Sequence, residues 1–265
     1  MGHLPVGRII NLSEIMNSET YRNAPIAEAA LDVRVRLPRD IGLDVLEAVR
    51  DESYSALHAR PVKVEFKVGA PESGPLAAPK SEIFNTPLGF AYTTEDRRQV
   101  FQIRTDGFTH NRLEPYVDWD SFSREAKRLW AKYVTVAKPE MIEILGLNYL
   151  NRIHVPLGAP FEEYFRTYIQ ISPDLPQSVN SYNLAFQLSW PGEEGIFAFV
   201  GQSLAPSLKE GFAAMILNIQ AFKQLNKPAA EVQDDEIWKT FNVLRDVKNS
   251  LFEGCITELV RKEIR

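Results

Sequence analysis

Six polar residues in two short stretches of the sequence have side chains that could bind an anion. They are Arg104, His110, Arg112, Asn148, Arg152 and His154. Arginine and histidine bind carboxylates and phosphates through charge-assisted hydrogen bonds. If residues 147–155 form a strand, the last three share one face of it with Leu150, because side chains alternate along a strand. We therefore predict these six as ligand-binding residues, with structural salt bridges or a solvated face as the alternative origin of the pattern.

No familiar catalytic or metal-binding constellation accompanies these residues. The four histidines include no i, i+4 pair and no HExxH motif, and a single cysteine cannot supply a CxxC zinc site. The sequence also lacks the glycine-rich loops that hold phosphates and the GxSxG turn of a nucleophilic serine. Cys255 falls on an apolar helical stripe and is expected to be a small buried hydrophobe. We predict no catalytic residue, no metal and no cofactor, and the balance favours a protein that is not an enzyme.

The composition is that of a globular protein in a reducing compartment. The chain has 265 residues, of which 45% are hydrophobic and 25% charged, and these values exclude a mainly disordered or fibrous chain. One cysteine cannot form an internal disulfide, and no basic patch precedes an apolar stretch near the start, so we predict a cytoplasmic location. No apolar run approaches the roughly 20 residues that span a membrane, so we expect no membrane association.

The net charge bears on nucleic acids as partners. The sequence holds 30 basic and 35 acidic side chains, for a net charge of −5. Phosphate neutralisation usually requires a basic domain, so nucleic acid is a disfavoured partner, although a local basic groove would not show in the composition.

The first part of the chain is expected to form an N-terminal arm, residues 1–24, and a sheet–helix unit, residues 25–138. Alternating apolar residues predict strands at 31–37 and 62–68, and apolar residues at helical spacing predict a helix at 42–58 between them. The remaining predicted elements are a Pro- and Gly-rich loop at 69–80, a hairpin of 90–93 with 99–105, a strand at 108–113, and a long helix capped by Asp120 or Ser121.

The second unit, residues 139–265, repeats this order. Its predicted elements are a helical stretch at 139–145, a strand at 147–155, a short helix at 162–169, strands at 184–190, 196–200 and 215–222, and a final helix that begins at Asp234 or Asp235. The continuous apolar run at 196–200 is typical of a strand buried on both faces. Lys248 and Asn249 lie inside the final helix, and because asparagine is a poor helix former, we expect a structural side-chain contact to hold it there.

These element orders predict an α+β protein built from two similar units, each an antiparallel sheet with a long helix. The helix would cover the apolar face of its sheet, and the two sheets could join edge to edge into one. The halves share no evident sequence identity, so a pseudo-duplication is inferred from the pattern alone. The layout is analogous to the helix-grip and TATA-box-binding-protein-like folds, an analogy that does not determine function.

Three segments of the sequence carry a family resemblance. They are NAPIAEA from residue 23, GLNYLNRI from residue 146 and LRDVKNSLF from residue 244. Together they resemble a sporadically distributed bacterial family of proteins of about this length that has no assigned activity. The most specific positions are Tyr149, Asn151, Arg152, Ile153, Lys248, Asn249 and Phe252. The resemblance implies no catalytic residues.

We expect a non-enzymatic binding or assembly protein that recognises a protein partner or a small ligand, and that can form a homodimer through its sheet edges or helix faces. The alternative is a hydrolytic or nucleic-acid-processing enzyme with an arginine and histidine site between the two halves, which requires Arg104, His110 and Arg112 to converge with the second stretch. A weaker alternative is nucleic-acid binding on a sheet face, which requires a contiguous positive patch.

Overall fold

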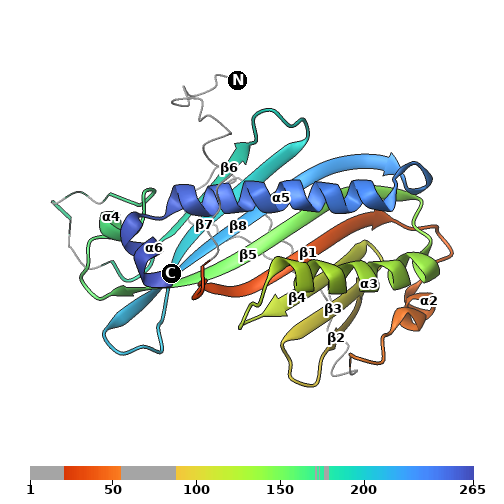
Figure 1. Ribbon diagram of the computed structural model, residues 1–265, viewed down its shortest axis with the longest axis horizontal. Helices are drawn as coiled ribbons and strands as arrows, with labels where there is room; N and C mark the ends of the chain where they lie inside the picture. The colour runs from red at the N-terminus through yellow and green to blue at the C-terminus, as the bar shows by residue number, and fades with distance from the viewer. Residues whose placement is uncertain (1–20, 55–87, 171, 173, 176–178) are drawn as a thin grey trace, which may run out of the picture.

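One eight-stranded antiparallel sheet organises the chain. The computed structural model describes residues 21–54, 88–170, 172, 174–175 and 179–265. The strands are β1 (Ile26–Arg36), β2 (Gly89–Thr93), β3 (Gln99–Arg104), β4 (Gly107–Leu113), β5 (Met141–Pro156), β6 (Asn183–Ser189), β7 (Ile196–Ala205) and β8 (Phe212–Pro228). Their order across the sheet is β2-β3-β4-β1-β5-β8-β7-β6, and all neighbouring pairs are antiparallel (Figure 1).

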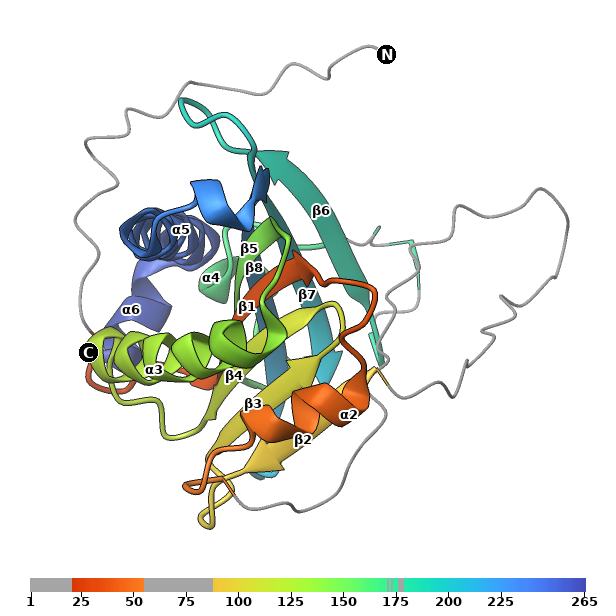
Figure 2. The same cartoon turned by 90° about the vertical axis from the view of Figure 1, so that its right-hand side faces the viewer.

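Two long helices pack side by side on one face of this sheet. They are α3 (Trp119–Ala137) and α5 (Asp234–Cys255), and we call the face that they cover the helix face (Figure 2). The shorter helices are α2 (Leu43–Leu46), α4 (Phe161–Tyr164), α6 (Glu258–Ile264) and two 3₁₀ turns (Glu47–Val49 and Ala229–Glu231). The predicted α+β class with antiparallel strands is confirmed.

The two halves of the chain occupy mirrored positions in the sheet. β1 and β5 pair at its centre, where Leu31 lies opposite Leu147. Outward from β1 the strands are β4, β3 and β2, and outward from β5 they are β8, β7 and β6. In each half, one of the two long helices follows the last strand, α3 after β4 and α5 after β8, and α6 follows α5.

The core lies between the sheet and the two helices. Alternate residues of the central strands are buried there, because side chains along a strand point to opposite faces. Fully buried examples are Leu31 and Val33 of β1, Leu145 and Leu147 of β5, Leu129 and Tyr133 of α3, and Phe241 and Leu244 of α5. Burial of each such side chain stabilises the folded state by about 1.5–3 kcal/mol. This free energy determines which face of each strand lies against the helices.

The hairpin of β2 and β3, the strand β4 and the strand at 147–155 are confirmed, but several other predictions were wrong. The stretch 139–145 is not helical, because β5 already begins at Met141. Of the helix expected at 42–58, residues 42–54 are described, and in them the helix is only α2, followed by a 3₁₀ turn that ends at Val49. The apolar run at 196–200 is not buried on both faces, since Phe199 is 37% exposed.

The ends of the two long helices also differ from the prediction. The cap of α3 is Asp118, whose carboxylate accepts a hydrogen bond from the Ser121 amide at 2.6 Å, so this helix begins earlier than expected. α5 ends at Cys255, and the residues beyond it form the separate helix α6. Cys255 is buried among apolar side chains, as predicted, and burial raises the pKa of its thiol to about 11.

Two predictions lie outside the described residues, namely the strand at 62–68 and the loop at 69–80. Of the predicted arm, only residues 21–24 are described. Among the described helices, none has the length and apolar character needed to span a membrane.

Candidate functional site

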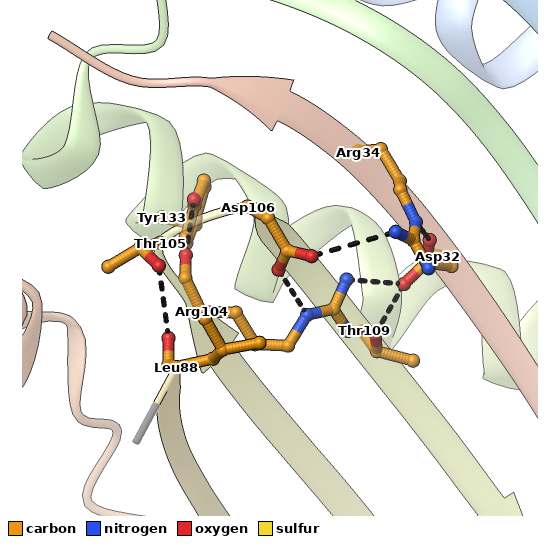
Figure 3. Close-up of polar contacts among 8 residues, drawn as sticks. All are labelled: Asp32, Arg34, Leu88, Arg104, Thr105, Asp106, Thr109 and Tyr133. Atoms are coloured by element: carbon orange, nitrogen blue, oxygen red, sulfur yellow. Dashed lines mark hydrogen bonds and ion pairs between the residues drawn. The ribbon is translucent and has the colours of Figure 1, made fainter. Parts of the chain in front are cut away.

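Arg104 lies in a compact network of polar side chains on the sheet face opposite the helices (Figure 3). Its guanidinium donates to Asp32 and to Asp106, each at 2.8 Å, and also contacts the Thr109 hydroxyl. The Thr109 hydroxyl donates to Asp32 at 2.6 Å, and Arg34 adds longer ion pairs to both carboxylates. All the groups come from β1, β3, β4 and the turn between β3 and β4.

This network holds the β3–β4 hairpin against β1. Arg104 is only 6% exposed, and burial by itself would lower the pKa of its guanidinium, but Asp32 and Asp106 outweigh burial and raise it. Tyr133 of α3 adds a hydrogen bond from its hydroxyl to the Arg104 carbonyl at 2.9 Å. With its side chain already engaged by two carboxylates, Arg104 has a structural role and little capacity left for an external anion.

His110 lies in the core on the helix face. Its ring is fully buried and stacks on Phe122 of α3 with centroids 5.2 Å apart. Neither ring nitrogen has a hydrogen-bond partner of good geometry in the described part of the chain. Burial therefore lowers the pKa of the imidazole to about 4, despite the charge of Glu125, which favours protonation.

The other predicted residues of the two stretches are spread over both faces. Arg112 is half-buried and shares the helix face with His110, since it lies opposite Ala29 of β1. Asn148 points to the opposite face, and its buried side-chain oxygen has no partner among the described residues. Because Arg104 and His110 point to opposite faces of one hairpin, the six residues do not form a single site.

A cleft opens on the helix face between the start of α3 and the second half of α5. Its volume is about 640 Å³, within the range of small-molecule sites. Residues 21–26 and the loop 114–118 form its rim, and Tyr149 and Asn151 of β5 lie among its lining residues. The lining also includes Arg152 and His154, so two of the six predicted residues belong to it.

Arg152 and His154 are already engaged at the edge of this cleft. Arg152 forms a 3.3 Å ion pair with Glu114, and both side chains are substantially exposed, so this pair contributes little to stability. His154 shares a 3.0 Å hydrogen bond between its Nδ1 atom and the Ser207 hydroxyl. Both side chains project from the face of β5 opposite to Tyr149, as the predicted alternation required.

Two cations of α5 line the cleft, and neither has a carboxylate partner in the part of the chain that the structure describes. Arg245 lies over the Trp119 ring at 5.7 Å, and the Lys248 ammonium lies over the Tyr149 ring at 4.1 Å from its centroid. Neither side chain forms an ion pair or a hydrogen bond within the described residues. The residues are three positions apart and therefore project from the same side of the helix.

The environment of Lys248 disfavours its charged form. Burial lowers the pKa of the amine, and the nearby Arg245 charge lowers it further, to about 7. Glu253 and Asp246 act in the opposite direction but are weaker. Glu253 is itself occupied, because it accepts hydrogen bonds from Arg261 and from the Tyr21 hydroxyl, each at 2.6 Å.

Aromatic rings and one hydroxyl pair complete the cleft. The hydroxyls of Tyr116 and Tyr149 lie 3.1 Å apart and share a hydrogen bond. Burial raises the pKa of Tyr116 to about 12, so this hydroxyl stays protonated at neutral pH. Trp119 and Phe252 add apolar surface, and the Trp119 indole donates to Asn242 at 3.0 Å.

The segments that carry the family resemblance contain several residues of this cleft, but the sequence did not predict that they lie together. All three resemblance segments line the cleft. NAPIAEA supplies residues 23–26 of its rim, and GLNYLNRI and LRDVKNSLF supply Tyr149, Asn151, Lys248 and Asn249. Asn249 has no side-chain hydrogen bond to a described residue, so the structural contact expected for it is not found there. Arg245 was missed, because an arginine in an amphipathic helix is most often part of a solvated face.

Comparison of the sequence with known protein families and with curated proteins finds no match. In the described part of the chain, no three His, Cys, Asp or Glu side chains are grouped so that they could hold a metal ion.

Proposed function

We propose that this protein binds a small organic anion in the cleft between α3 and α5. The observation that carries the proposal is the pair Arg245 and Lys248, two neighbouring cations that line one cleft and have no carboxylate partner in the described structure. Arg245 and Lys248 are both half-buried, and placing two like charges side by side in such a setting is unfavourable. A bound anion would reduce that cost. A carboxylate or phosphate group is the natural counter-ion for such a pair.

The walls of the cleft favour an organic rather than an inorganic anion. Trp119, Tyr149 and Phe252 line the cleft as aromatic residues that are themselves largely buried, and Tyr116 adds a hydroxyl. Small-molecule sites combine apolar walls with convergent polar groups. This cleft has aromatic walls, but much of its lining is polar and includes the carboxylates of Glu114, Asp118 and Asp120.

Titration calorimetry with benzoate and phenyl phosphate tests the proposal, with benzyl alcohol as a neutral control. We expect both anions to bind and the alcohol not to bind. Hydrogen bonds to charged groups contribute about 1.5–3 kcal/mol, so Arg245→Met or Lys248→Met should each weaken binding by about tenfold to a hundredfold. Lys239→Met is the matched control, because Lys239 is an exposed lysine of the same helix. No anion binding, or equal binding by wild type and Lys248→Met, would refute the proposal.

We also infer that the fold arose as a pseudo-duplication of helix-grip type. The mirrored strand order and the one long helix per half support this, because β1 corresponds to β5, β4 to β8 and α3 to α5 in both order and place. The cleft then lies near the line that relates the halves, as ligand sites at the junctions of such units often do.

A further inference from the structure

We propose that Lys248 forms an imine with a small 2-oxo carboxylic acid whose carboxylate is held by Arg245. This inference rests on the proposed function, because it names the class of anion and the chemistry of its second group. It goes beyond anion binding in assigning a covalent step to one amine of the cleft.

The spacing of the two side chains fits such a ligand. Residues three apart on a helix have Cβ atoms about 5–6 Å apart, so their flexible ends can reach adjacent groups of one small molecule. A 2-oxo acid carries its carbonyl on the carbon next to the carboxylate. The planar guanidinium of Arg245 can donate two hydrogen bonds to the carboxylate, which leaves the Lys248 amine beside the carbonyl carbon.

The Lys248 amine is available for attack. No carboxylate within the described residues holds it as an ion pair, and its neighbour is the face of the Tyr149 ring. A pKa of about 7 leaves a large share of the amine neutral at neutral pH, and the neutral amine is the nucleophile. Lys239 on the same helix is an exposed lysine beside Asp235 and serves as the comparison.

The step balances without a cofactor. The amine nitrogen adds to the carbonyl carbon, and the C–N bond forms as the carbonyl π-bond breaks. The oxygen then leaves as water with both protons of the amine, and a C=N bond remains. The amine lies over the Tyr149 ring, and we assign the hydrogen-bonded hydroxyls of Tyr116 and Tyr149, which line the same cleft, as the donors of a hydrogen bond to the departing oxygen.

Reductive trapping with pyruvate tests the inference on the full chain. Sodium borohydride supplies a hydride to the imine carbon, so each imine becomes a stable secondary amine that peptide mass spectrometry locates. We expect Lys248 to be labelled at least about tenfold more than Lys239, with a rate that rises through about pH 7. Acetone, which lacks the carboxylate, should label Lys248 weakly. Arg245→Met should reduce pyruvate labelling more than acetone labelling, because both reactions lose the effect of the Arg245 charge on the pKa of Lys248, but only pyruvate also loses the partner of its carboxylate.

The outcomes separate this inference from the proposed function. Lys248→Arg keeps the positive charge and lacks the nucleophile, so it should still bind benzoate and lose the label. If pyruvate labels lysines only in proportion to their exposure while benzoate still binds, the imine is refuted and anion binding stands. If benzoate does not bind and Lys248 is not labelled, both ideas fail. Circular dichroism of each variant confirms that it is folded before the comparison is made.

Discussion

The buried histidine of β4 should make this protein less stable in mild acid. His110 is neutral in the folded protein, where burial holds the pKa of its imidazole at about 4, against 6.5 for an exposed histidine. Between these two values the unfolded chain binds a proton that the folded chain does not, so unfolding becomes more favourable as the pH falls. This loss of stability is absent above about pH 7 and reaches its full size only below about pH 4.

The size of the effect follows from the two pKa values. A difference of one pKa unit corresponds to about 1.4 kcal/mol, so the full loss is about 3 kcal/mol, and about 2 kcal/mol of it falls between about pH 7.5 and pH 5. That is a large part of the 5–15 kcal/mol typical of a folded domain. The neutral ring stacks on Phe122, but its nitrogens lack a hydrogen-bond partner of good geometry among the described residues, so burying it has a cost of its own that does not depend on pH.

Urea unfolding of wild type and His110→Leu at about pH 7.5 and about pH 5 measures this contribution. The free energy of unfolding should fall between the two pH values by about 2 kcal/mol less in the variant than in wild type. Because the other titrating groups are the same in both proteins, their contributions cancel in this comparison. Ile103→Val serves as the control, because it trims a buried side chain of the neighbouring strand and keeps the histidine. It should lower stability by about 0.5–1.5 kcal/mol at both pH values. An equal pH dependence in wild type and His110→Leu would contradict the assignment of a neutral, buried imidazole.

Two further predictions concern charge and backbone geometry. Asp51 is buried, and although burial alone would raise the pKa of its carboxyl, Arg128, Lys132 and the Ser53 amide hold it well below 3.8. Asp51→Asn should therefore lower the free energy of unfolding, measured with urea at neutral pH, by about 1.5–3 kcal/mol. The difference from wild type should shrink as the pH falls below about 4, because protonation of Asp51 then removes the same ion pairs from wild type. Gly107 has a φ of +151°, and a Cβ there would lie 2.2 Å from the Val33 carbonyl oxygen. Gly107→Ala should lower the midpoint of thermal unfolding by several degrees, corresponding to about 1–3 kcal/mol, and an unchanged midpoint would contradict the close approach of β4 to β1.

Much of the secondary structure was determined by local patterns in the sequence. The alternation around Leu31 and Val33 and the polar turn between β2 and β3 predicted strands correctly, because a half-buried strand repeats with a period of two residues. The same reasoning failed at 139–145. A short apolar run does not distinguish a strand from a helix, and the chain leaves α3 at Lys138 in a left-handed conformation with φ 44° before it enters β5.

The residues that could bind a ligand were only partly accessible to such reasoning. Arg104 and His110 are close in sequence, but the register of β3 and β4 places Arg104 opposite Gly107 and His110 opposite Phe101, on different faces of the sheet. A slip of one residue in that hairpin would reverse the faces of one strand's side chains, and no local pattern specifies the register.

By itself the sequence determined the class of the fold, the strands and helices with a clear period, and the identity of the segments that carry polar residues. Only the tertiary structure decided which of these residues meet. Tyr149 and Lys248 are far apart in the chain, and they come together because α5 crosses the sheet above β5 and β8 (Figure 1). Periodicity records which side chains are buried, whereas a cleft depends on how separate elements pack, and that is set by the summed contacts of the whole core.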